Sequence, residues 1–184
     1  HNISLVSNWD ILTFVANYTQ THNKIMYWNE QEGVNENITT LSYRNFKNLP
    51  VLTLSLTAAP RIGVWSPQLI LFCQKQWFDI ERLGSKFDLS EPIWGILWNN
   101  TFDFKDNWIA ETRLKVTSKG ITENTELTRT TCAFNFSVRK AFLNDRLSVT
   151  VGVNDLFNRT ANHVILYTNN LKTSINQEYD SRQA

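Results

Sequence analysis

Charged side chains whose chemistry could be functional stand at every second position of one short stretch, at Glu111, Arg113 and Lys115. Side chains two residues apart on a β-strand project from the same face, so these three would project together. A second polar set continues the pattern further along the chain: Asn135, Ser137 and Arg139, followed by Asn154. Either these side chains contact a solute or another protein element, or they pair across strands as a ladder of salt bridges. The ladder is the simpler interpretation.

The residues that usually carry catalysis or bind metals are scattered along the chain. His1, His22 and His163 have no partner pattern around them, and no cysteine spacing typical of a zinc site occurs. Cys73 and Cys132 fall in separate segments, and we expect free thiols that pack as small hydrophobic groups. We therefore expect no catalytic residue, no metal site, no bound cofactor and no enzymatic activity. The formal net charge of +1 gives no electrostatic reason to expect a nucleic-acid partner.

Apolar residues alternate with the polar ones in the same stretches, which is the pattern of β-strands. Asn144 and Asp145 supply a turn between two such runs and predict a hairpin whose apolar residues all lie on one side. The apolar positions of this hairpin, together with an earlier alternating run, are Cys132, Phe134, Phe136, Val138, Leu147, Val149, Val151, Val153, Leu52, Leu54 and Leu56. No sustained helical period occurs in the sequence.

The alternation predicts an all-β fold, an antiparallel up-and-down meander of about eight full strands followed by the start of a last one. The expected strands span residues 9–20, 24–30, 38–59, 64–78, 92–104, 108–118, 131–139 and 147–153. Pro50 removes one backbone donor, so we expect a bulge or a break there. Short connections are expected near 21–23, 60–63, 105–107 and 143–145, and longer ones near 31–37, 79–91, 119–125 and beyond 158.

This alternation of short and long connections would collect all short turns at one end of the meander. Bacterial outer-membrane barrels are built in this way, with short periplasmic turns and longer extracellular loops. Five aromatic residues lie beside the short turns and would form the interfacial girdle of such a barrel: Trp65, Phe102, Phe104, Trp108 and Phe142. The alternative explanation is that large aromatic residues simply favour strands.

The composition is compatible with a partial transmembrane β-barrel. The 184 residues are 42% hydrophobic, and the mean hydropathy is −0.32. No run of about 18 apolar residues occurs, which excludes a helical membrane protein but not a β-barrel. If the apolar face meets lipid, the charged sets line the lumen, because a charge facing lipid at the midplane would cost about 2–4 kcal/mol.

The run Val-Asn-Asp-Leu-Phe-Asn at 153–158, in a hairpin that follows Lys-Ala-Phe-Leu, resembles the penultimate hairpin of TonB-dependent receptor barrels. The Leu-Thr-Leu-Ser-Leu-Thr of 52–57, the Pro–Trp turn at 60–65 and the hairpin at 98–116 are similar to the same outer-membrane β-barrel family. The resemblance implies a barrel of about 22 strands, occluded by an N-terminal plug. It also implies location in the outer membrane of a Gram-negative bacterium and uptake of a scarce solute, driven by an inner-membrane complex.

On this interpretation residues 1–184 are one segment of a larger barrel, with neither a plug domain nor an energy-coupling segment inside it. The tail at 171–184 resembles only the beginning of the usual last strand. The expected partners are outer-membrane lipid, the remaining strands and plug of the same protein, and the energy-coupling complex.

Two alternatives remain open. One is an uncoupled porin or a structural outer-membrane barrel. The other is a soluble secreted β-sandwich that binds carbohydrate, which would bury Leu147, Val149, Val151 and Val153 against a second layer. Most expected strands have ten or more residues, which favours a bilayer-spanning barrel over a sandwich.

Overall fold

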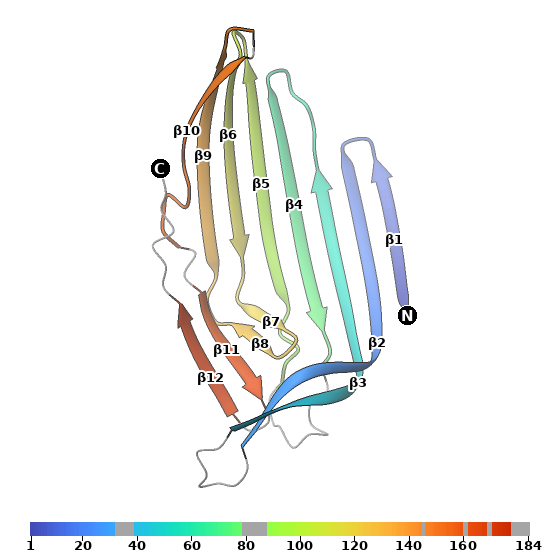
Figure 1. Cartoon of the computed structure of the whole chain (residues 1–184). Helices are drawn as coiled ribbons and strands as arrows, with labels where there is room; N and C mark the ends of the chain where they lie inside the picture. The colour runs from blue at the N-terminus through green and yellow to red at the C-terminus, as the bar shows by residue number, and fades with distance from the viewer. Residues whose placement is uncertain (32–38, 79–87, 145, 160–161, 169–170, 178–184) are drawn as a thin grey trace.

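The long alternating runs form one open antiparallel sheet, in which each long strand pairs with the long strands before and after it in the sequence (Figure 1). The structure is a computed structural model, and it describes residues 1–31, 39–78, 88–144, 146–159, 162–168 and 171–177. In order across the sheet the strands are β1 (Asn2–Trp9), β2 (Leu12–Gln31), β3 (Thr39–Ala58), β4 (Trp65–Gln76), β5 (Ile93–Phe104), β6 (Trp108–Thr117), β9 (Thr131–Phe142) and β10 (Leu147–Val153). The predicted all-β meander of eight full strands is confirmed, and the sheet is not closed, as in a partial barrel.

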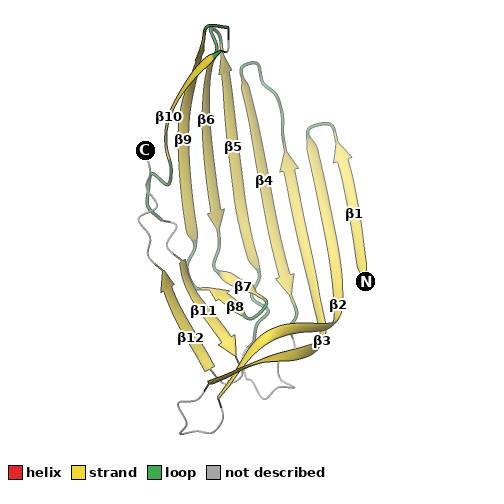
Figure 2. Cartoon of the chain, in the orientation of Figure 1, coloured by secondary structure: helices red, strands yellow, loops and turns green. Residues whose placement is uncertain are grey.

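A second sheet of four short strands lies at one end of the large sheet (Figure 2). It pairs β12 (Leu171–Gln177), β11 (Asn162–Thr168), β8 (Thr125–Leu127) and β7 (Gly120–Thr122) in that order. Strand secondary structure accounts for all regular elements of the described residues. No helix among those residues is long and apolar enough to cross a membrane.

Short turns and long connections lie at opposite ends of the large sheet, as the sequence predicts (Figure 1). Polar residues with a positive φ make several short turns: Asp10 in the first, Asp106 and Asn107 in the third, and Asn144 in the last. Such side chains tolerate the left-handed conformation that tight turns need. The second short turn places Gly63 at φ 60°.

The prediction for the first two strands is wrong. Residues 21–23 form no turn, because β2 runs through them and stays paired with β3 from Leu12 to Gln31. Asn23 has φ 54°, and the β2–β3 hairpin bends strongly in this part of its length (Figure 1). The first turn lies instead at Asp10 and Ile11, between β1 and β2.

The bulge expected at Pro50 is also wrong, because β2 and β3 keep one register on both sides of it. The Pro50 carbonyl accepts a hydrogen bond from the backbone nitrogen of Trp77 at 3.0 Å. In an antiparallel strand the nitrogen and carbonyl of a residue point to the same side. The missing donor therefore points toward β4, just beyond the last pair, Val51 with Gln76, and costs no bond to β2.

The loop expected at 119–125 is a hairpin of β7 and the start of β8. The polar tail beyond 158 contains β11 and β12, and β12 pairs with β11 in the second sheet rather than extending the large one. Most of the loops expected at 31–37 and 79–91 lie outside the described residues.

The buried core lies at the long-connection end, where the bent β2–β3 hairpin, the β4–β5 connection and the second sheet meet. Its members are Met26, Phe46, Leu49, Phe78, Leu89, Ile121 and Tyr167. We call this part of the molecule the cap. Among the described residues no second layer packs on the large sheet beyond the cap, so both of its faces are open there.

Candidate functional site

Strand register divides the large sheet into two chemically different faces. Cross-strand partners lie on the same face, so the pairs Leu54–Cys73, Cys73–Trp94 and Val138–Val151 belong together. All eleven apolar positions predicted to face lipid fall on this one face, which we call the apolar face: Leu52, Leu54, Leu56, Cys132, Phe134, Phe136, Val138, Leu147, Val149, Val151 and Val153. Both Cys73 and Cys132 are free thiols.

The opposite face, which we call the polar face, carries the predicted charged and amide residues. Glu111 pairs with Ser137, Arg113 pairs with Asn135, and Arg139 lies on the same face two residues beyond Ser137. Lys115 shares this face on β6, and Asn154 lies with Asn135 in the same cleft. The structure thus brings the predicted polar residues to one side of β6, β9 and β10.

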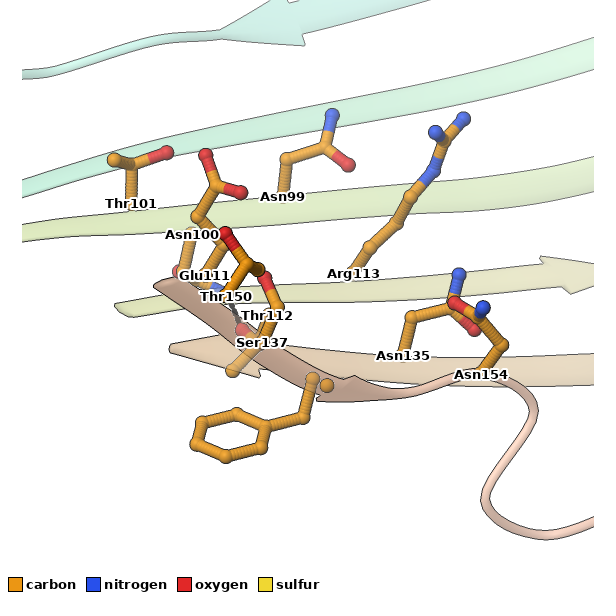
Figure 3. A pocket seen from close by; sticks show the side chains of 12 residues that line it. Asn99, Asn100, Thr101, Glu111, Thr112, Arg113, Asn135, Ser137, Thr150 and Asn154 are labelled. Atoms are coloured by element: carbon orange, nitrogen blue, oxygen red, sulfur yellow. Dashed lines mark hydrogen bonds between the residues drawn. The ribbon is translucent and has the colours of Figure 1, made fainter. Parts of the chain in front are cut away.

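Five of the predicted polar residues line an open cleft of about 560 Å³, namely Glu111, Arg113, Asn135, Ser137 and Asn154, whereas Lys115 and Arg139 lie on the same face outside its lining. Figure 3 shows Asn99, Glu111 and Arg113 rising from the same side of β5 and β6. The polar-face residues that line it are Asn99, Thr101, Glu111, Arg113, Asn135, Ser137, Thr150, Gly152 and Asn154. The cleft offers amides, hydroxyls, one carboxylate and one guanidinium, a set that forms hydrogen bonds with polar solutes or with a polar protein surface.

The hydrogen bonds of the cleft hold its amides in place. Asn99 donates from Nδ2 to Oε1 of Gln68 on β4 at 3.1 Å. Asn135 accepts at Oδ1 a bond from the backbone nitrogen of Asp155 at 2.9 Å, which fixes the chain just after β10 against β9. Gly152 allows the close approach of β10, because a Cβ there would lie 2.9 Å from the carbonyl oxygen of Phe136.

The salt-bridge ladder expected from the sequence is not formed. Within the described parts of the chain, Glu111, Arg113, Lys115 and Arg139 make no ion pair within 4.0 Å. Register explains this, because Arg113 faces Asn99 and Asn135, whereas Glu111 faces Thr101 and Ser137. Lys115 faces Leu97 and Ala133, and Arg139 faces Ile109 and Thr150, so none of these four charges stands directly across from an opposite charge.

The candidate residues chosen from the sequence leave out four polar-face residues of the cleft, namely Asn99, Thr101, Thr150 and Gly152, although the alternation at 147–153 places Thr150 and Gly152 on the polar side of their strand. Their signal was present, since each alternates with an apolar-face residue on a strand that the pattern did predict. What the pattern lacked was the register, which brings β5 beside the charged residues of β6 and brings β10 beside β9.

The five predicted girdle aromatics lie on the apolar face at the short-turn end. The Trp65 and Phe102 rings stack with centroids 6.2 Å apart, and Phe102 and Phe104 stack at 6.1 Å. Phe104 pairs with Trp108, while the fifth member, Phe142, pairs with Leu147 at the last turn. Trp9 stands at the first turn on the same face and was missed, because that turn was predicted elsewhere.

The apolar face has the height of a bilayer core. Along β5 it runs from Trp94 to Phe104, which is roughly 33 Å at about 3.3 Å per residue. A strand tilted by about 40° would reduce this to about 25 Å, the usual height of the apolar band of an outer-membrane barrel.

One polar network interrupts the apolar face near its middle. Asn100 is only 6% exposed. Its Oδ1 accepts a hydrogen bond from Trp65 Nε1 at 3.0 Å, and its Nδ2 donates to Thr112 Oγ1 at 3.0 Å. Polar groups in apolar surroundings are tolerated when they are paired in this way.

Several ionisable residues are tied to the cap. Lys24 forms an ion pair with Glu123, and Lys119 pairs with Glu91 at 3.4 Å. The hydroxyl of Tyr167 donates to Glu126, and burial followed by this carboxylate raises the pKa of Tyr167 to about 12. In the described segments no three His, Cys, Asp or Glu side chains gather as metal ligands would.

Comparison with known proteins agrees with this geometry. A sequence model of the outer membrane protein beta-barrel family matches residues 1–184, the full length of the chain. No curated protein and no solved structure matches it. The family match indicates a location in the outer membrane of a Gram-negative bacterium, where the protein is surrounded by lipid. The chain belongs to the outer membrane protein beta-barrel family.

Proposed function

We propose that this chain is part of the wall of an outer-membrane receptor that takes up a scarce solute, with its apolar face toward lipid and its polar face toward the lumen. The observation that carries the proposal is the division of the sheet by register. One face is almost continuously apolar and bounded by aromatic rings, and the other holds a cleft of amides, hydroxyls and charges. The proposed role is recognition and passage rather than catalysis.

The exposure of the apolar face supports a membrane setting over a soluble sandwich. Val151 is 71% exposed, and Leu147 and Val149 are each 50% exposed. A sandwich would bury these side chains against a second sheet. Contact with lipid accounts for apolar side chains that remain half or more exposed among the described residues.

Energy coupling is the finer part of the proposal. The unpaired charges Glu111 and Arg113 give the polar face groups that could contact either the solute or a plug, as in TonB-dependent receptors. On this proposal the plug and the remaining strands belong to the same protein, and an inner-membrane complex drives uptake. An uncoupled porin would use the same wall without these partners.

The orientation can be tested with a pair of neighbouring substitutions at the same depth. Phe136→Arg places a charge near the middle of the apolar face and should reduce the free energy of unfolding by about 2–4 kcal/mol. Ser137→Arg, on the polar face opposite Glu111, is the matched control and should cost little. Urea unfolding of the whole protein in detergent micelles measures both, and equal costs would contradict the orientation.

Coupling requires a separate measurement in cells. A strain lacking the gene and a complemented strain are compared for growth on single limiting nutrients, which identifies the solute. Accumulation of that solute is then followed with and without an uncoupler that collapses the proton gradient. We expect the uncoupler to abolish accumulation, whereas passive equilibration that the uncoupler leaves unchanged would support the porin alternative.

A further inference from the structure

We infer that the apolar face carries a phospholipid site at its short-turn end, in which Lys140 binds the phosphate and a groove beside Ala110 receives one acyl chain. This inference rests on the proposed orientation of the apolar face toward lipid. It goes beyond solute uptake, since the ligand is a lipid of the surrounding leaflet and the site lies on the outer surface of the wall.

The first observation is the position of Lys140, a cation on the apolar face at its short-turn end. Lys140 pairs with Trp108 on β6 and with Val149 on β10, so its side chain leaves the sheet on the apolar side. Its ammonium lies 4.9 Å from the centre of the Trp108 ring and 5.8 Å from that of Phe142. It also donates a hydrogen bond to the carbonyl oxygen of Asp106 in the neighbouring turn.

This geometry places the charge at the boundary between apolar face and turns. A long basic side chain there can lay its methylenes along the apolar surface and raise its ammonium to the headgroup level. An ammonium has three donors, and the Asp106 carbonyl takes one of them. Within the described residues Lys140 has no ion pair, so a phosphate oxygen supplies the missing negative charge.

The second observation is an apolar groove of about 390 Å³ directly beside this cation. It is lined by Phe104, Trp108, Ile109, Ala110 and Val138. The pair Ala110–Val138 is the next same-face pair after Trp108–Lys140, so the groove lies next to Lys140 along β6 and β9. The small side chain of Ala110 leaves the surface hollow between larger neighbours. A cation at the rim of an apolar groove is complementary to a lipid that joins a phosphate to a hydrocarbon chain.

Binding to the whole protein in detergent micelles, measured by native mass spectrometry, tests the site. The probes are dioleoyl phosphatidylglycerol, dioleoylglycerol with the same chains but no phosphate, and inorganic phosphate. The variants are Lys140→Gln, Ala110→Leu to fill the groove, and Lys105→Gln as a control. Lys105 is an exposed cation of the adjacent turn, so its loss changes the net charge equally. Heat-modifiable electrophoretic mobility confirms that each variant is folded.

We expect Lys140→Gln to weaken phosphatidylglycerol binding roughly tenfold, as loss of a charge-assisted hydrogen bond would, while Lys105→Gln changes it less than twofold. Dioleoylglycerol binding should not respond to Lys140→Gln, and Ala110→Leu should weaken both lipids. Equal phosphatidylglycerol binding by both lysine variants would overturn the headgroup contact. If Lys140→Gln also abolishes binding of inorganic phosphate, and Ala110→Leu leaves the binding of both lipids unchanged, the site binds a free anion rather than a lipid.

The proposed orientation can fail independently of this site. If the apolar face does not meet lipid, Phe136→Arg and Ser137→Arg will cost the same, whatever the lysine variants do. If the orientation holds and the site does not, Phe136→Arg remains costly while Lys140→Gln binds phosphatidylglycerol as well as the unmodified protein.

Discussion

Gln76 connects the end of β4 to two segments of the cap, and replacing it should release the cap from the large sheet. Its side chain is 1% exposed. Nε2 donates to the carbonyl oxygens of Leu89 at 2.8 Å and Glu123 at 2.7 Å, and Oε1 accepts from the backbone nitrogen of Glu123 at 2.6 Å. One amide thus satisfies three backbone groups from the β4–β5 connection and the β7–β8 hairpin.

Gln76→Leu keeps nearly the same side-chain volume and removes all three hydrogen bonds. Each buried backbone group left without a partner costs about 1–3 kcal/mol. Leu89 is fully buried, whereas Glu123 is half-buried and its groups can partly reach water. Counting the Leu89 carbonyl in full and the Glu123 groups in part gives about 2–4 kcal/mol of lost stability for the cap. At about 1.4 kcal/mol per factor of ten, this raises the population of the open cap by roughly 30- to 700-fold.

Hydrogen exchange of the whole protein in micelles, followed by mass spectrometry, measures this opening segment by segment. Amides of residues 120–127 should exchange faster by that factor in Gln76→Leu, while amides of 108–117 in β6 should keep their protection. Gln74→Leu is the matched control, since Gln74 lies on the same face of β4 two residues earlier and has no hydrogen bond from its side chain among the described contacts. Unchanged exchange at 120–127, or an equal effect of the control, would refute the reasoning.

Three further predictions concern single side chains. Thr112→Val leaves the Asn100 amide without its acceptor in apolar surroundings and should cost about 1–3 kcal/mol in urea unfolding. Adding Asn100→Leu should restore only part of the loss, because Trp65 Nε1 then loses its own acceptor. Gly95→Ala places a methyl group 2.3 Å from the Phe72 ring and should cost about 1–3 kcal/mol by the same assay, with partial rescue by Phe72→Leu. The hydroxyl of Tyr167 should ionise near pH 12, compared with about 10 in the unfolded chain. As the pH rises, the unfolded chain loses the Tyr167 proton before the folded protein does. The protonated hydroxyl therefore stabilises the cap fully below pH 10, and this stabilisation is lost as the pH rises to about 12. Phenolate absorbance should show a late-titrating component that Tyr167→Phe removes.

The long strands could be predicted because their alternation repeats many times. Strand β5 was expected at 92–104 and spans Ile93–Phe104, and β6 was expected at 108–118 and spans Trp108–Thr117. Ten or more residues of mostly regular alternation leave only the ends uncertain. The N-terminal error has a local cause, since the polar run at 21–23 has the composition of a turn. Asn23 does adopt the left-handed conformation of a turn residue, but in a bend within β2.

The cap could not be predicted by the same reasoning. Strands β7 and β8 have three residues each, too few for a period of two to be recognised. Its core takes members from strands far apart in the sequence, such as Met26 on β2 and Tyr167 on β11. No local pattern marks a residue such as Gln76 as the one whose amide joins two of these segments.

The cleft lies between these two cases, because part of its register can be counted from the sequence and part cannot. The turn at 105–107 places Phe104 opposite Trp108, and counting five residues outward from this pair brings Asn99 opposite Arg113. The neighbour on the other side, Asn135, stands beyond a connection that contains the whole β7–β8 hairpin. The length of that connection does not determine the register between β6 and β9. The apolar face determines it instead, because a slip of one residue would turn every apolar side chain of β9 to the polar side. The row that carries Asn99, Arg113 and Asn135 is therefore fixed from one side by a turn and from the other by the requirement that the opposite face stay apolar.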